Sequence, residues 1–194
     1  MAGLFNAAIK SITTASLSSQ YSLSPQPTSY SGPWKIYDAK KKSTGQACSV
    51  FIFERSSLNA PGQSLRSNQG LKAAQDEVVD RLKKEVSLLA RLRHPNILEL
   101  VEPVEESRSG LMFVTEVVVG SLQSVLDDKA GAEDSRRRRR ADVDIDELEI
   151  QKGLLQLAKG LEFLHESAGL VHGNLTPEGI FVNSKVRPSL RIPV

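Results

Sequence analysis

The chain has 194 residues, of which 40% are apolar and 25% charged, and its formal net charge at pH 7 is +2. This is an ordinary composition for one or two soluble domains, and so small a charge does not indicate a nucleic-acid partner. The single cysteine, Cys48, cannot form an intrachain disulfide, which fits a reducing compartment. No secretory signal is visible, and no apolar run approaches the ~20 residues of a membrane span. We therefore expect a cytoplasmic protein without a transmembrane segment.

Residues 1–29 are predicted to form a flexible N-terminal segment, rich in Ser and Thr and without acidic residues. A short amphipathic helix in it would place six apolar side chains on one stripe: Leu4, Phe5, Ala8, Ile9, Ile12 and Ala15. Such a helix could make a weak peripheral contact with a membrane or bind a partner. Because Lys10 is the only charge available to meet anionic lipid, we favour a tail or a helix docked on the next domain.

The next part of the chain predicts two strands and a long helix. Residues 34–54 read as two strands separated by a basic turn, and residues 56–70 read as a loop. Residues 72–93 are the first strong helix, and Pro95 prevents its continuation. Steps of four, four and three residues predict one buried face, made of Val78, Leu82, Val86 and Leu89.

A hairpin and a short helix are predicted next. Residues 97–104 and 111–119 are β-like and are joined by a polar turn, and residues 121–126 are a short helical candidate. Residues 127–146 form a segment of low hydrophobicity that contains five consecutive arginines, Arg136 to Arg140. A nuclear-import signal or a contact with an acidic surface is one interpretation. We favour a solvated, disordered insertion, because the acidic neighbours offset much of the basic field.

A second long helix is predicted over residues 147–166, with Gly169 as a stop just past it. Its apolar residues recur at steps of four, three, four and three: Ile150, Leu154, Leu157, Leu161 and Leu164.

The segment from His172 to Val182 has the outline of a protein-kinase catalytic loop, whose signature is H-R-D-L-x-x-x-N. In that loop the Asp receives the substrate hydroxyl proton and the Asn holds a magnesium ion. Here Gly173 replaces the Arg, Asn174 replaces the Asp and Gly179 replaces the Asn. The segment therefore indicates the fold and argues against the activity.

The chain resembles a protein-kinase N-lobe and the start of a C-lobe over roughly residues 30–183. Within kinases it is most similar to the SCY-like (SCYL) pseudokinases. Three stretches carry that likeness: Trp34-Lys35-Ile36-Tyr37, Ser49-Val50-Phe51-Ile52-Phe53 and His172-Gly173-Asn174-Leu175-Thr176-Pro177. The resemblance implies an α+β fold, with an antiparallel β N-lobe, an αC helix and an incomplete helical C-lobe. The N-lobe and hinge would span residues 30–119, the start of the C-lobe residues 120–183, and an atypical tail residues 184–194.

The resemblance also identifies a degenerate nucleotide cleft. Near Gly32 only one glycine stands where a phosphate-binding loop has three, so Gly32 is either a remnant of that loop or, as we favour, an ordinary turn glycine. Alignment on the V-A-I-K strand places Phe51 against the adenine position and Phe53 at the lysine position, which suggests a filled cleft.

Three further positions of the cleft follow from the same alignment. Glu85 is the expected αC glutamate, either paired with another cation such as Arg55 or lying at the edge of the helix interface. Thr115 takes the gatekeeper position and Glu116 the hinge. We expect no cofactor and no metal site.

For function, the resemblance implies a catalytically inactive scaffold in Golgi and clathrin-coated vesicle traffic, peripheral to Golgi or endosomal membranes. Its partners would be vesicle-coat or Golgi trafficking proteins. One alternative is a divergent ATP-binding Ser/Thr kinase, which rests on Glu85, Thr115 and the hinge. Another is a truncated, non-functional fragment, because kinase C-lobes continue well past this loop and Val186-Arg187 could be encoded by a read-through splice donor.

Overall fold

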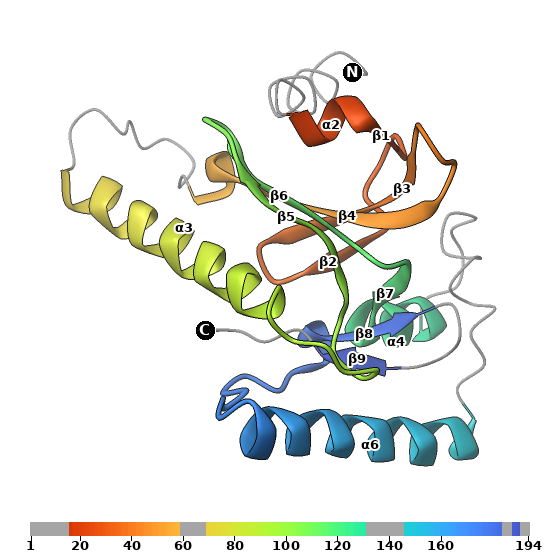
Figure 1. Ribbon diagram of the computed structural model, residues 1–194. Coiled ribbons are helices and arrows are strands. Elements are labelled where there is room, and N and C mark those ends of the chain that lie inside the picture. Colours follow the sequence, from red (N-terminus) through yellow and green to blue (C-terminus); the bar gives the residue numbers. More distant parts are fainter. Residues whose placement is uncertain (1–15, 59–68, 131–145, 184–187, 191–194) are drawn as a thin grey trace.

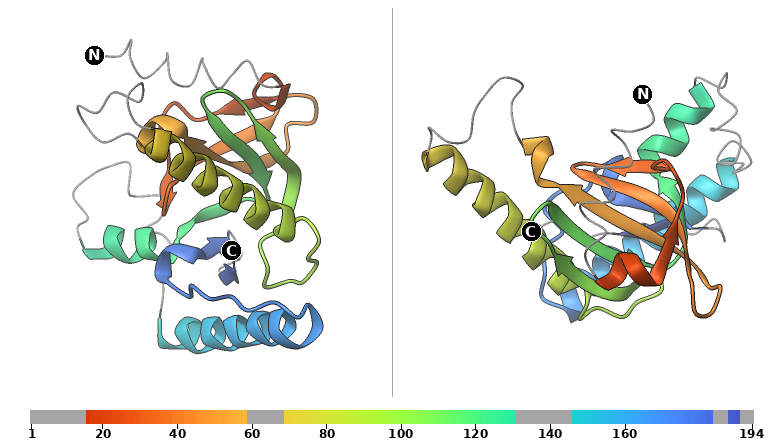
Figure 2. Two further views of the ribbon diagram at one scale, coloured as in Figure 1. Left: turned by 90° about the vertical axis from the view of Figure 1, so that its left-hand side faces the viewer. Right: turned by 90° about the horizontal axis from the view of Figure 1, so that it is seen from above.

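The computed structural model describes residues 16–58, 69–130, 146–183 and 188–190. Six strands form a larger antiparallel sheet in the order β1-β3-β4-β6-β5, with β2 paired to β3, and a smaller antiparallel sheet has the order β7-β8-β9. The smaller sheet lies between the larger sheet and helix α6 (Figures 1 and 2). The predicted α+β fold with an antiparallel N-lobe is confirmed.

The elements of the N-lobe are α2 (Ser16–Gln20), β1 (Tyr21–Leu23), β2 (Ser29–Ser31), β3 (Trp34–Lys41), β4 (Ala47–Glu54), the 3₁₀ turn η1 (Arg55–Leu58), α3 (Gln69–Leu89), β5 (Leu100–Glu106) and β6 (Gly110–Thr115). They are followed by β7 (Val118–Ser121), α4 (Leu122–Ala130), α6 (Glu147–Glu162), the π-helical turn η3 (Phe163–Ser167), the 3₁₀ turn η4 (Pro177–Gly179), β8 (Ile180–Asn183) and β9 (Pro188–Leu190).

The larger sheet has an apolar core on each face, because successive side chains of a strand point to opposite sides. On β4, Phe51 and Phe53 belong to the core shared with α3, β7 and β8. Val50 and Ile52 belong to a second core on the other face, where Leu17 of α2 also packs. The central strand is therefore buried from Cys48 to Phe53, which explains the apolar run from Val50 to Phe53.

Helix α3 packs on the sheet with a slightly different face from the predicted one. Leu82, Val86 and Leu89 are buried as expected, but Val79 is 2% exposed while Val78 is 37% exposed. Val79 lies three residues before Leu82, so it continues the same stripe through a step of three where the sequence pattern suggested a step of four. The prediction of Val78 as a core residue is wrong.

Ordered elements begin before residue 30, where the sequence placed the start of the N-lobe. The Leu17 N–H donates to Glu105 Oε2 at 2.9 Å, and the Tyr21 hydroxyl donates to Glu102 Oε1 at 3.0 Å. These contacts tie α2 and β1 to strand β5, which lies at the far edge of the same sheet. The predicted amphipathic helix before them, like the arginine run at residues 136–140, lies outside the described residues.

The chain changes sheets at the end of β6. The predicted strand at 111–119 is in fact two strands, since β6 stays in the larger sheet and β7 begins the smaller one. Residues 188–190, which the sequence analysis assigned to an atypical tail unlike a strand, pair as β9 with β8 in the register Phe181↔Ser189. A proline at the first position of an edge strand leaves the backbone free to pair at its neighbours.

Helix α6 carries the predicted apolar stripe, but only its C-terminal half is covered. Leu157 and Leu161 pack against the main core and Leu164 is fully buried, whereas the first turns are open. Four apolar residues there are 51–62% exposed: Leu148, Ile150, Leu154 and Leu155. The predicted stop at Gly169 is confirmed by its φ of +64°. Among the described helices, none is long and apolar enough to cross a membrane.

Replacing Leu154 and Leu155 together with glutamine is expected to reduce self-association of the 194-residue chain, because exposed apolar clusters promote association. Analytical ultracentrifugation over a concentration series measures the effect. Leu126→Gln on α4 is the matched control, since Leu126 is 44% exposed and lies on a different helix. A double variant that sediments like the parent chain would contradict the expectation.

Candidate functional site

Aromatic side chains fill the space between the larger sheet and β7–β8, where the resemblance places a nucleotide cleft. Five of them have no exposed surface, and they come from strands β3, β4, β6 and β8: Trp34, Phe51, Phe53, Phe113 and Phe181. Three of these, Trp34, Phe113 and Phe181, were not among the residues predicted for the site. The signal that could have identified them is an aromatic residue at a strand position that faces the core.

The rings contact one another in the two geometries that aromatic pairs favour. Phe51 stacks on Phe113 with ring centroids 4.7 Å apart and an interplanar angle of 16°. Phe181 meets the edge of Phe51 at 5.4 Å, and Trp34 meets the edge of Phe113 at 4.8 Å. Phe51 is thus packed among other aromatic rings, and a filled nucleotide cleft stays a prediction.

The resemblance places Phe53 at the position of the strand lysine of an active kinase. It shares the inner face of β4 with Phe51 and contacts Trp34 edge-on at a centroid distance of 6.0 Å. The next residue, Glu54, belongs to the opposite face of the strand and forms an ion pair with Lys35 at 2.8 Å. Phe53 is therefore an apolar ring with no exposed surface, part of the main core.

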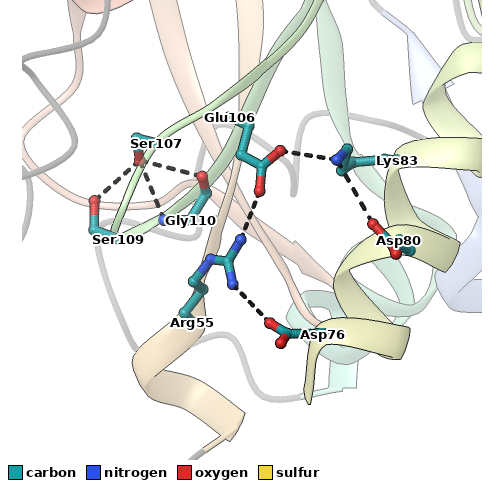
Figure 3. A network of polar contacts seen from close by, with 8 residues as sticks. All are labelled: Arg55, Asp76, Asp80, Lys83, Glu106, Ser107, Ser109 and Gly110. Atoms are coloured by element: carbon teal, nitrogen blue, oxygen red, sulfur yellow. Dashed lines mark hydrogen bonds and ion pairs between the residues drawn. The ribbon is translucent and has the colours of Figure 1, made fainter. Parts of the chain in front are cut away.

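Arg55 instead belongs to an ion-pair network on the outside of the molecule (Figure 3). Its guanidinium contacts Glu106 Oε1 at 2.6 Å and Asp76 Oδ1 at 3.4 Å. Asp76 lies nine residues before Glu85 on α3, about 13.5 Å away along a helix axis. The site geometry thus favours a role for Arg55 with the first turns of α3 and with β5, and not the pairing with Glu85 that the sequence left open.

Glu106 joins the two halves of this network. Its second oxygen accepts from Lys83 Nζ at 2.8 Å, and Lys83 also lies 3.6 Å from Asp80. The hydrogen bond from Lys83 lowers the pKa of Glu106, with further lowering by the positive charges of Lys83 and Arg55. The same contact raises the pKa of Lys83. Helix α3 is therefore attached to η1 and β5 by charges that lie outside the aromatic core.

Glu85, the expected αC glutamate, is buried with 4% of its surface exposed. It lies between Leu82 and Leu89 on the side of α3 that faces the sheet, as the sequence predicted.

Polar groups of the predicted hinge, residues 115–118, form hydrogen bonds with other groups of the same chain. Thr115 is fully buried, and its hydroxyl donates to the carbonyl of Glu116 at 2.9 Å. The Glu116 N–H donates to the carbonyl of Glu99 at 3.0 Å, and the Val118 N–H donates to Ser49 Oγ at 3.0 Å. Backbone N–H groups often orient a ligand in a cleft, and here those of Glu116 and Val118 already have partners within the chain.

The catalytic-type loop has a backbone that suits its altered residues. Gly173 has a φ of +66°, and the Asn174 N–H donates to the His172 carbonyl at 2.8 Å. A left-handed conformation costs a residue with a side chain about 1–2 kcal/mol, so glycine suits this position better than the arginine of an active kinase. His172 is buried, whereas Asn174 is exposed.

Gly32 forms the turn between β2 and β3, with a φ of +51°. This conformation supports the interpretation of Gly32 as a turn glycine. Its N–H donates to Glu178 Oε2 at 3.2 Å, so the turn lies against the segment that contains Gly179. Gly179 itself is buried, and its N–H donates to the Thr176 carbonyl at 2.9 Å. Sequence reasoning did not single out Glu178.

The Phe51→Ala variant is expected to lower the free energy of unfolding by about 3–5 kcal/mol, the usual cost of removing a buried phenylalanine ring. Chemical denaturation monitored by far-UV circular dichroism measures it. Val101→Ala on β5, where the side chain is 41% exposed, is the control and should change stability by roughly 0.5 kcal/mol or less. Equal losses in the two variants would mean that Phe51 is not part of a packed core.

The Glu106→Gln variant is expected to be less stable than the parent by about 0.2–1 kcal/mol at neutral pH, the range for exposed ion pairs. Because folding lowers the Glu106 pKa below its usual 4.5, the contribution is present above that value and is lost as the pH falls through the folded pKa. The stability difference should therefore shrink in acid, as measured by denaturation at a series of pH values.

Glu77→Gln is the control, because the ion pair of Glu77 with Arg81 lies within α3. It should cost less than Glu106→Gln. The interpretation would fail if the Glu106 variant were as stable as the parent at neutral pH.

Comparison with protein families matches residues 65–192 to the protein kinase domain. Protein kinase domain-containing protein ppk32 of Schizosaccharomyces pombe is 39% identical over 79% of this chain and 21% of its own length. Human SCY1-like protein 2 is 39% identical over 77% of this chain and 15% of its own length. A Dictyostelium discoideum protein named "Probable inactive serine/threonine-protein kinase scy1" is 30% identical over 88% of this chain and 17% of its own length.

The chain therefore spans between 15% and 21% of the length of these relatives. The family match covers more than half of the chain. The chain belongs to the protein kinase domain family, and SCY1-like proteins are among its relatives.

Proposed function

We propose that the chain is a catalytically inactive protein kinase-like domain that works as a protein-binding scaffold. The single observation that carries the proposal is the stack of Phe51 on Phe113, closed by the edge of Phe181, in the place of a nucleotide base. All three rings are fully buried. Separating these rings to admit a ligand would expose a large apolar area to water and would cost several kcal/mol of free energy.

The chemistry of the surrounding residues supports the same proposal. Phosphoryl transfer depends on positioned phosphates, a magnesium clamp and a residue that orients the nucleophile. Phe53 offers no cation, Asn174 cannot act as a base near neutral pH, and Gly179 has no side chain to hold a metal. General-base help alone is worth about 10²–10⁴-fold in rate, and the loss of electrostatic stabilisation adds to it.

For the cellular role, we propose the one implied by the likeness to the SCY-like family. That role is a scaffold in Golgi and clathrin-coated vesicle traffic, peripheral to Golgi or endosomal membranes and bound to coat or trafficking proteins. The similarity to SCY1-like protein 2 and the word "inactive" in the name of the Dictyostelium relative support the family assignment on which this rests.

A nucleotide-binding experiment tests the proposal that the domain is catalytically inactive. A ligand present at ~100 times its Kd stabilises a folded protein by about 2.7 kcal/mol, which raises Tm by several degrees in a domain of this size. We expect no change in Tm with ATP and Mg²⁺ in the millimolar range, and no transfer of labelled phosphate to a generic protein substrate. An active Ser/Thr kinase domain measured in parallel confirms that the assay detects binding.

A magnesium-dependent rise in Tm with ATP would instead favour the divergent kinase, in which Glu85, Thr115 and the hinge retain their roles. Phosphate transfer by the chain, and its loss in a Glu85→Gln variant, would establish that alternative and overturn the proposal.

A further inference from the structure

The turn between β2 and β3 is held against the catalytic-type loop by two contacts with the same residue. Ser31 Oγ donates to the Glu178 carbonyl at 2.7 Å, and the Gly32 N–H donates to the Glu178 carboxylate at 3.2 Å. The partners lie 147 and 146 residues apart in the chain. Ser31 has no exposed surface, so the first of these hydrogen bonds is partly sheltered from water.

A set of buried hydroxyl groups fastens the strand β2 itself to the smaller sheet. The Ser121 N–H donates to Ser29 Oγ at 3.1 Å, and Ser29 Oγ donates to Ser124 Oγ at 2.8 Å. Ser121 Oγ lies 2.9 Å from both the Tyr30 carbonyl and Ser124 Oγ. Ser29 and Ser121 are at most 1% exposed. Buried hydroxyl groups need partners, and these find them between β2, β7 and α4.

In the kinase family, the turn after this strand lies over the phosphates of ATP, which the backbone N–H groups approach. Here Pro33 has no N–H to offer, and the Gly32 N–H is already directed at a carboxylate of the same chain. Glu178 thus presents a negative charge at the amide that a phosphate oxygen would use.

We propose that Glu178 and the buried serines Ser29, Ser31 and Ser121 form a clasp that keeps the β2–β3 turn closed over the catalytic-type loop without any nucleotide. The intrachain carboxylate takes the place of a phosphate at Gly32, so the closed arrangement of the two sheets is a built-in state of the domain. The clasp is distinct from the aromatic filling of the cleft, because it acts at the cleft's rim through hydrogen bonds.

Hydrogen–deuterium exchange of the full 194-residue chain without nucleotide tests the clasp. The readout is the exchange rate of peptides covering residues 28–34, taken relative to peptides from β4 so that global unfolding is not counted. Glu178→Ala should speed this exchange by about 2- to 12-fold, the range that corresponds to the loss of one net hydrogen bond. Ser31→Ala should speed it as well.

Glu178→Gln provides the conservative rescue, because its amide oxygen can still accept from the Gly32 N–H. It should exchange close to the parent rate. Ser107→Ala is the matched control, since Ser107 holds the β5–β6 turn by comparable hydrogen bonds with Gly110. It should leave residues 28–34 unchanged.

Parent-like exchange in Glu178→Ala would overturn the proposal, whatever the serine variants show. Equal acceleration in the Ser107 control would overturn it too, because the effect would then not be local. The outcome is independent of the proposed inactivity: ATP binding by the parent chain would refute that function, yet the exchange rates measured without nucleotide would still decide on the clasp.

Discussion

The interdigitation of Phe51, Phe113 and Phe181 is the constraint on which the rest of the structure depends. These side chains come from β4, β6 and β8, so one packed cluster joins the two sheets. Close-packed interiors leave little room for an additional ring without a shift of the surrounding elements. The same contact that stabilises the domain carries the proposal that the place of a nucleotide base is filled.

Filling the cleft with apolar residues changes how α3 is attached. A lysine at position 53 would be a charge inside the core, where an unpaired charge is costly, and Phe53 avoids that cost. At the surface, Glu106 contacts both Arg55 and Lys83 and attaches α3 by charges (Figure 3). Each exposed ion pair contributes little stability. Apolar packing of Val79, Val86 and Leu89 therefore provides most of the free energy that holds α3 on the sheet.

Much of the fold could be predicted because its signals are local. The apolar run of β4 and the helix stop at Gly169 depend on neighbours within a few residues, and both are where the sequence placed them. The choice between Val78 and Val79 could not be settled in this way, since both are valines at helical spacing from Leu82. The strand at residues 188–190 was missed because its pairing partner β8, and not its own composition, makes it a strand.

The sequence by itself determined the family, the departures at Gly173, Asn174 and Gly179, and the presence of aromatic residues at Phe51 and Phe53, because these are identities at aligned positions. Only the tertiary structure decided what those residues contact. The partners of Arg55, the satisfied hinge amides and the meeting of Gly32 with Glu178 join segments that lie far apart in the chain. Local propensity carries no information about such distances, which are set by how two sheets and a helix pack together.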